Sequence, residues 1–173
     1  MAQDRIAEII RAGVEMEREG QRIYRDAAAK SKHPFAGKMF ESLAKDEERH
    51  EQWFLTLSAK RGISPAPLAK LDPDGFLKQI RAVFKGLRKQ IDGLKPAADD
   101  IQVIDLALGL EEKSYRLYLE ASEAATSPDE RAVLAFVARE ENNHWRILDD
   151  AKLYLTDPVK WNIKEESPLI DGG

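Results

Sequence analysis

The chain contains no cysteine in its 173 residues. This absence excludes disulfide bonds, thiolate nucleophiles, iron–sulfur clusters and thiolate zinc sites within the sequence. Carboxylates and imidazoles are then the side chains suited to binding a metal, and such ligands favour hard or borderline ions.

Long apolar runs and concentrated positive charge are also missing. No stretch approaches the roughly 20 apolar residues of a membrane-spanning helix, and the first residues, MAQDRIAEIIRAG, include acids and begin an amphipathic pattern at once. Lys and Arg are interspersed with Asp and Glu, and the net charge is −4. The sequence therefore predicts a cytoplasmic protein whose partners include neither nucleic acid nor membrane.

Four segments carry inward-facing residues at alternating spacings of three and four, the pattern of helices that bury one face. Four such segments predict an all-α fold, a four-helix bundle. The four stripes are Ile6, Ile10, Gly13, Glu17, Gly20, Tyr24 and Ala27; Phe40, Leu43, Glu47, His50, Phe54 and Leu57; Ile104, Leu108, Glu111, Ser114, Tyr118 and Ala121; and Leu134, Val137, Glu141, His144, Leu148, Ala151 and Leu155.

Turn residues set the domain organisation. The second helix is bounded by Pro34 and Gly62, and the fourth opens with a capping-box pattern at Ser127 and Glu130. Residues 62 to about 98, with a short helix expected after Asp72-Pro73, are long enough to return along a helix of ~27 residues, ~40 Å in length. The prediction is a bundle over residues 1–157, with a crossover that makes the second and third helices parallel, and a C-terminal tail over 158–173.

The polar members of the stripes form a repeated pattern. Glu17, Tyr24, Glu47 and His50 recur as Glu111, Tyr118, Glu141 and His144, each 94 residues later (111 minus 17). In a helix the spacing Glu-x-x-His places both side chains on one face. The sequence therefore predicts that four glutamates and two histidines meet inside the bundle.

Burial of these acids requires a positive partner. An ionised carboxylate buried alone costs several kcal/mol or more, and no lysine or arginine lies near them on the stripes. Two divalent ions with two neutral imidazoles balance four carboxylates. The alternative is a bundle whose inward acids only form hydrogen bonds or line a water-filled channel, and the repetition of the pattern disfavours it.

The geometry predicts how the ligands divide. Glu17 and His50 serve one metal, Glu111 and His144 serve the other, and the carboxylates of Glu47 and Glu141 bridge. Oxygen-rich ligand sets with one imidazole suit iron or manganese, whereas zinc binds competitively without redox chemistry. Two iron ions are the predicted cofactor.

Two acids and two tyrosines near the predicted ligands each allow two interpretations. Asp46 and Glu140 precede the motif glutamates, where an acid can accept the outer N–H of a histidine on a facing helix, or remain simply solvated. Tyr24 and Tyr118 are candidate catalytic residues, because a phenol there can hydrogen-bond a ligand carboxylate or an intermediate; core packing is the alternative.

Other polar and aromatic residues are interpreted as structural. His33, before Pro34, is expected in a loop or capping role. Trp53, Trp145 and Trp161 are expected to pack in the core or an interface.

The chain resembles the rubrerythrin branch of the ferritin-like superfamily. The similar stretches are GVEMEREGQRIYRDAA, LAKDEERHEQWF, LGLEEKSYRLYLEAS, VAREENNHWRIL and YLTDPVKW. The resemblance implies that the six residues, Glu17, Glu47, His50, Glu111, Glu141 and His144, are ligands of a di-iron centre that reacts with oxygen or peroxide, and that the protein is a homodimer.

Two departures from that family modify the expectation. Rubrerythrins proper carry a further domain in which paired cysteines hold one iron, so here the resemblance implies an external electron-donor protein. They also carry an extra carboxylate three residues after the third-helix ligand, where this chain has Ser114. The resulting six-ligand site resembles that of bacterioferritin, which favours ferroxidase over peroxidase activity.

The functional hypothesis is an oxidoreductase that reduces peroxide or oxygen, oxidises Fe(II), or does both, at a symmetric dinuclear centre. Open metal positions and carboxylates able to shift between bridging and terminal modes suit such a cycle. The alternatives are an iron-handling or storage protein with a ferroxidase centre and a redox-inactive bundle that its metals stabilise.

Overall fold

A computed structural model describes residues 2–62 and 100–166, with side chains placed for 7–62 and 100–164. The helices are α1 (Ala2–Lys30), α2 (Pro34–Lys60), α4 (Asp100–Ala124), α5 (Pro128–Thr156) and α6 (Pro158–Glu166), and no strand occurs in these ranges. The all-α prediction is confirmed. The crossover prediction, including its short helix, falls almost wholly outside the described residues.

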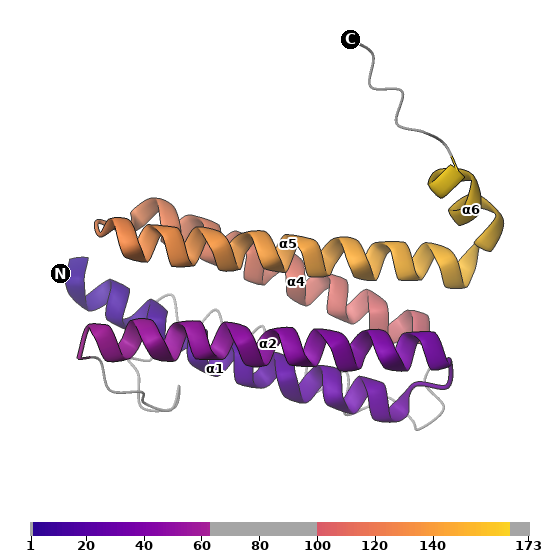
Figure 1. Cartoon of the computed structure of the whole chain (residues 1–173), viewed down its shortest axis with the longest axis horizontal. Coiled ribbons are helices and arrows are strands. Elements are labelled where there is room, and N and C mark those ends of the chain that lie inside the picture. The colour runs from indigo at the N-terminus through magenta and orange to yellow at the C-terminus, as the bar shows by residue number, and fades with distance from the viewer. Residues whose placement is uncertain (1, 63–99, 167–173) are drawn as a thin grey trace, which may run out of the picture.

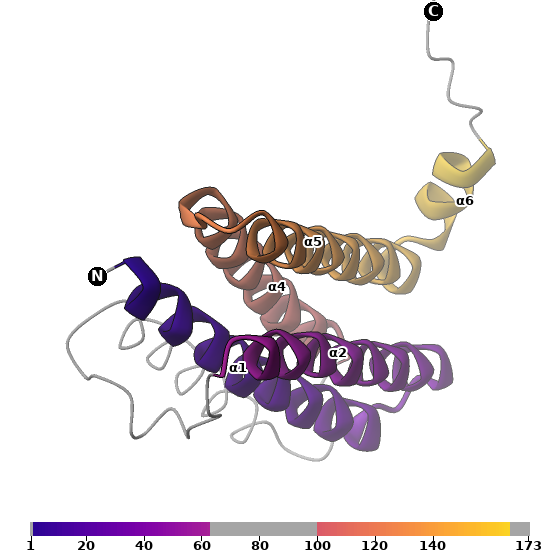
Figure 2. The ribbon, with the colours of Figure 1, turned by 60° about the vertical axis from the view of Figure 1, so that its left-hand side comes forward.

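The four long helices form two antiparallel hairpins. Helix α1 packs along α2, and α4 packs along α5, so that the hairpins lie one above the other in Figure 1 and as two facing layers in Figure 2. Helices α2 and α4 run in the same direction (Figure 1). This is the predicted parallel relation, and the arrangement is that of a ferritin-like bundle.

Helices α2 and α5 begin in the same way. Each has proline in its first turn, and the preceding residues, His33 and Ser127, have extended backbones with ψ of 119° and 130°, as proline requires of the residue before it. Neither makes a side-chain cap hydrogen bond. The predicted capping box is therefore wrong.

Glu130 has another role in the structure. Its side chain is fully buried and forms an ion pair with Arg61, just beyond the end of α2. The prediction failed because a carboxylate that is turned inward cannot also reach back to the backbone of its own helix. The pair links the C-terminal end of α2 to the first turn of α5.

The core consists of two apolar clusters with the polar residues between them. The Ile10 cluster contains Ile9, Ile10, Ala12, Val14, Met16, Ile23, Phe54, Leu57, Leu110, Leu117, Tyr118, Ala121, Ala125, Leu134, Val137 and Ala138. The Phe40 cluster contains Tyr24, Ala27, Ala36, Met39, Phe40, Leu43, Ala44, Val103, Ile104, Ala107, Leu148 and Ala151. A shift of 94 residues carries many members of one cluster onto the other, as the sequence repeat requires.

The described part of the predicted tail is mostly helical. Trp161 of α6 packs edge-on against Tyr154 of α5, with ring centroids 5.3 Å apart, and Lys164 pairs with Asp150. Within the described ranges, no helix combines the length and the apolar character that crossing a membrane demands.

Candidate metal centre

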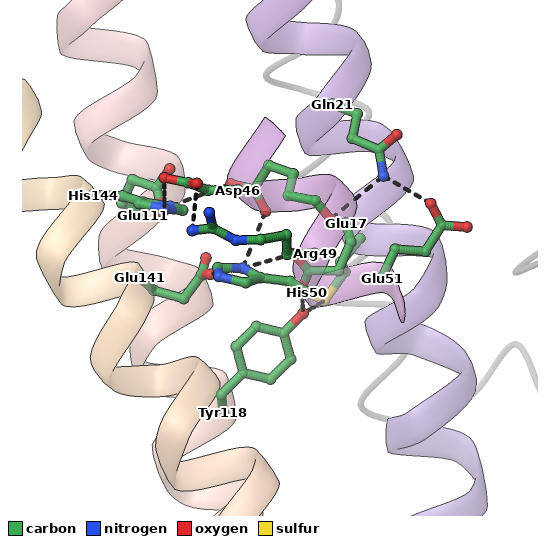
Figure 3. A network of polar contacts seen from close by, with 12 residues as sticks. Glu17, Gln21, Asp46, Arg49, His50, Glu51, Glu111, Tyr118, Glu141 and His144 are labelled. Atoms are coloured by element: carbon green, nitrogen blue, oxygen red, sulfur yellow. Dashed lines mark hydrogen bonds and ion pairs between the residues drawn. The ribbon is translucent and has the colours of Figure 1, made fainter. Parts of the chain in front are cut away.

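The six predicted ligands come together at the middle of the bundle. Each is at most 3% exposed. Their apolar stripes carry them inward, and the five that Figure 3 labels, all except Glu47, face one another between the hairpins; Glu47 belongs to the same cluster of ligand atoms. They come from all four long helices: Glu17 from α1, Glu47 and His50 from α2, Glu111 from α4, and Glu141 and His144 from α5.

Two overlapping groups of ligand atoms are present. One contains Glu17, Glu47, His50 and Glu141, the other contains Glu47, Glu111, Glu141 and His144, and within each group the ligand atoms lie within 4.8 Å of one another. Glu47 and Glu141 belong to both groups. This is the division that the sequence predicts for two metals with two bridging carboxylates.

The histidines point their Nδ1 atoms into the cluster. Nδ1 of His50 lies 3.1 Å from Oε1 of Glu141 and 3.3 Å from Oε2 of Glu17. Nδ1 of His144 lies 3.3 Å from Oε1 of Glu47 and 3.7 Å from Oε2 of Glu111. Glu47 also approaches His50 through its other oxygen, at 3.5 Å, so one carboxylate faces both imidazoles.

Several of these atoms have no hydrogen-bond partner, although buried polar atoms usually have one. They are Oε2 of Glu17, Oε2 of Glu111, Oε1 of Glu141, Nδ1 of His144 and both ring nitrogens of His50. Apart from Nε2 of His50, the outer ring nitrogen, these atoms lie together in one buried cluster, and carboxylate oxygens with imidazole nitrogens are a suitable donor set for two divalent cations. The residues therefore fit a dinuclear metal centre.

Without cations, protons must offset the charge. Burial, followed by the charges of Glu47 and Glu111, raises the pKa of Glu141 to about 8. Burial also raises the pKa of Glu17, and the charges of Glu47 and Glu141 add to the effect. The metal-free cluster therefore holds carboxyl protons at neutral pH that a bound metal must displace.

The histidines hold protons for a different reason. Burial alone lowers the pKa of His50, but the nearby carboxylates of Glu141, Glu17 and Glu47 outweigh it and raise the pKa to about 12. The pKa of His144 is raised against burial in the same way, first by Asp46 and then by Glu111. The pKa of Glu47 is lowered, because hydrogen bonds from its neighbours outweigh its burial.

The two tyrosines bind across the bundle. The hydroxyl of Tyr24 on α1 donates to Oε1 of Glu111 on α4, and that of Tyr118 on α4 donates to Oε1 of Glu17 on α1. Of the two sequence readings, the structure thus favours the hydrogen bond to a ligand carboxylate. Burial raises the pKa of both phenols, and the charges of Glu111 and Glu17 raise it further, so both stay protonated donors.

The outer partners of the two histidines differ. Oδ2 of Asp46 lies 3.6 Å from Nε2 of His144, as the sequence predicts for an acid on a facing helix. Glu140 instead accepts a hydrogen bond from Asn143, at 3.3 Å, and Nε2 of His50 has no hydrogen-bond partner. The same prediction for Glu140 is therefore wrong.

Two aromatic rings stack against that of His50. Its ring stacks on that of Trp53 with centroids 5.0 Å apart, and on that of His144 at 5.2 Å. Trp53 in turn meets Phe136 edge-on at 4.7 Å. Trp53 is thus packed as predicted, and it also lines a surface groove of about 390 Å³ with Leu57, Val133 and Phe136.

Sequence reasoning missed the importance of Gly20. A Cβ at this position would lie 3.2 Å from Cγ and Cδ of Glu47, so only glycine leaves full room for that shared carboxylate. The available signal was a glycine on the buried stripe of a long helix, where it is disfavoured unless something approaches closely. Gln21, also missed, is buried and donates to the backbone carbonyl of Glu47 and, at 2.8 Å, to Oε2 of Glu51.

A small cavity lies beside the carboxylates. Its volume is about 10 Å³, and it is lined by Met16, Glu17, Gly20, Glu47, Leu110, Glu111, Ser114 and Glu141. These residues form four pairs at the 94-residue offset, so the cavity lies where the two halves of the repeat meet. A space of this size accommodates about one water molecule.

A protein-family model described as rubrerythrin matches residues 8–152. The matched span contains all six predicted ligands and both tyrosines. No curated protein and no solved structure gives a significant match.

Proposed function

The chain belongs to the rubrerythrin family, and we propose that it is a di-iron oxidoreductase that couples oxidation of Fe(II) to reduction of hydrogen peroxide or oxygen. Glu17 and His50 would hold one iron, Glu111 and His144 the other, with Glu47 and Glu141 shared.

One observation carries the proposal: the two ligand groups overlap in two carboxylates. A site for a single structural ion needs no second imidazole and no second set of acids. Shared carboxylates hold two ions near each other, and such a pair can act on one small oxidant together.

Two ferrous ions held by these residues would supply two electrons, which with two protons convert one hydrogen peroxide to two waters. The chain's own residues prepare the site for this chemistry. Tyr24 and Tyr118 fix the terminal carboxylates of Glu111 and Glu17. Gly20 and Ser114 line a small cavity beside the carboxylates. Its size admits small oxidants and excludes larger molecules. An external protein would return the electrons in repeated turnover, and a homodimer remains a prediction.

Stopped-flow mixing of anaerobic ferrous-loaded protein with peroxide, and separately with oxygen, tests the proposal. We expect near-ultraviolet absorbance of ferric iron to appear at least tenfold faster than in buffer with the same Fe(II), with two irons oxidised per peroxide. Glu47→Ala, which lacks a shared ligand, is the matched control and should behave like buffer. If oxidation is no faster than in the control, the proposal is contradicted. The remaining alternative is then a redox-inactive bundle in which metals only stabilise the fold.

Iron handling is the second candidate, favoured by Ser114 at the edge of the small cavity, where rubrerythrins proper place another carboxylate. A protein that only oxidises iron and passes it on needs no seventh ligand. Size-exclusion chromatography with iron analysis after repeated Fe(II) additions separates the two. More than two irons retained per chain in a large assembly supports storage, whereas two irons in a small oligomer supports the oxidoreductase.

A further inference from the structure

We propose that the two metal positions are unequal: the position at His144 and Glu111 binds its metal more tightly and fills first, and Asp46 is the positioning residue responsible. The inference rests on the proposed dinuclear function, and it concerns a difference between two sites that the repeat would otherwise make equivalent.

The first observation is the partner of His144. Asp46 Oδ2 lies 3.6 Å from Nε2, the ring nitrogen that points away from the cluster. Asp46 also pairs with Arg49 of its own helix at 2.5 Å, which holds the carboxylate in place (Figure 3). An acceptor here keeps the imidazole proton on Nε2 and leaves the Nδ1 lone pair directed at the metal position.

The second observation is the lack of such a partner at His50. Its Nε2 is buried without a hydrogen bond, and the counterpart of Asp46, Glu140, bonds to Asn143 instead. The ring is covered by Trp53, whose own counterpart, Ile147, is 45% exposed. Among the described residues, the carboxylate beside His144 has no counterpart at His50, and the tryptophan over His50 has no counterpart at His144.

The consequence follows from where the proton must go. A metal bound through Nδ1 leaves the imidazole proton on Nε2. At His144 that N–H points toward a carboxylate, but at His50 it is buried without an acceptor, which is costly. Partners of this kind change metal affinity by roughly 10–100-fold, so we expect the two positions to differ by about that factor and a half-loaded protein to be a defined species.

Titration of the metal-depleted protein with Co(II), followed by calorimetry and visible absorbance, tests the inference without any turnover. The wild type should show two binding steps that differ roughly 10–100-fold in affinity. Asp46→Asn and Asp46→Ala should weaken the first step by about that factor and leave the second within about threefold, so that the two steps merge.

Matched variants control for charge and for the ion pair. Glu140→Gln removes the equivalent acid of the other half and should leave both steps unchanged. Arg49→Gln removes the partner of Asp46 but keeps its carboxylate, and should weaken the first step less than Asp46→Asn does. Helical circular dichroism verifies that each variant is folded.

Crystals given less than one equivalent of Co(II) locate the first ion. Anomalous density at His144 and Glu111 supports the inference, and density at His50 and Glu17 overturns it. The inference is also overturned if the two binding steps have equal affinity, or if Asp46→Asn and Glu140→Gln have equal effects. Either result leaves the proposed dinuclear function intact. Failure to bind either Co(II) or Fe(II) overturns the proposed function itself.

Discussion

The α1–α2 hairpin and the α4–α5 hairpin are two versions of one unit. The six proposed ligands, the two tyrosines and the helix-initiating prolines coincide at the 94-residue offset. Several pairs next to that set diverge: Asp46 against Glu140, Trp53 against Ile147, and Gly20 against Ser114. The inner ring of donors is thus common to both halves, while the residues that support it differ. Identical proposed ligands therefore have different surroundings in the two halves.

The apolar layers differ in a complementary way. Gly13 on α1 lies against the ring of Phe54, where a Cβ would come within 2.7 Å of a ring carbon. The counterparts, Ala107 and Leu148, are both buried in the Phe40 cluster. One half therefore uses a smaller residue with a larger neighbour, and the other uses intermediate sizes. Such exchanges keep the total volume of a core nearly constant.

The strongest test of equivalence removes shared ligands. Glu47→Ala and Glu141→Ala each delete a carboxylate that belongs to both groups, so each should lose both metals. Glu17→Ala and Glu111→Ala delete a ligand of one group and should retain about one metal per chain. Metal analysis after gel filtration measures the difference. Retention of two ions by Glu47→Ala contradicts the bridging assignment.

Removal of the metals should make stability depend on pH. The pKa of Glu141 is raised to about 8 and that of His50 to about 12, so the folded metal-free protein holds protons that the unfolded chain releases. Its stability in this respect therefore falls as pH rises, between 4.5 and about 8 through Glu141 and between 6.5 and about 12 through His50. The lowered pKa of Glu47 acts only in acid, below both windows.

Scanning calorimetry at several pH values measures this effect. The melting temperature of the metal-free form should fall by several degrees from about pH 6 to 9, because about 1 kcal/mol shifts it by roughly 2–4 °C at this chain length. The metal-loaded form should not show the fall, since its carboxylates are already ionised. Parallel curves for the two forms contradict the protonation of the empty cluster.

A smaller effect is expected where the halves differ in packing. Gly13→Ala should destabilise the protein by about 1–3 kcal/mol, because the buried ring of Phe54 must move. Phe54→Leu in addition, which imitates the Ala107 and Leu148 arrangement, should recover part of that loss. Urea unfolding of the single and double variants measures the coupling free energy between the two substitutions. Strictly additive effects would show that the two positions do not compensate.

The smallest expected effect compares the crossed phenols. Tyr24→Phe and Tyr118→Phe each remove one hydrogen bond to a carboxylate of the cluster, and because a bound metal would share the charge of that carboxylate, we expect the loss to stay below about 1.5 kcal/mol. We expect both variants to keep two metals and to slow iron oxidation to a similar extent. A large difference in rate between the two variants would show that the different outer partners of His50 and His144 also affect the carboxylates that the tyrosines contact.

Much of the fold followed from the sequence, because the spacing of inward residues dictates which helix faces meet. The same stripes place Glu17 and His144 in one buried layer, so the composition of the site was also readable. The partner of each outer residue was not. Glu130 and Glu140 carry the same carboxylate group as Asp46, which does lie where it was predicted. Where such a side chain points depends on its rotamer and on the axial offset between facing helices, and the sequence pattern specifies neither. The acceptors of Tyr24 and Tyr118 across the bundle depend on the same offset.

The layered core has a consequence for how the metal-free chain opens. Helices usually loosen from their ends, but here each end is anchored in an apolar cluster and the charged layer occupies the midpoint. After metal removal, the backbone around the donors becomes the weakest section of each long helix. Amide hydrogens near Glu47 and Glu141 should then exchange faster than those one or two turns away on either side, an inversion of ordinary fraying.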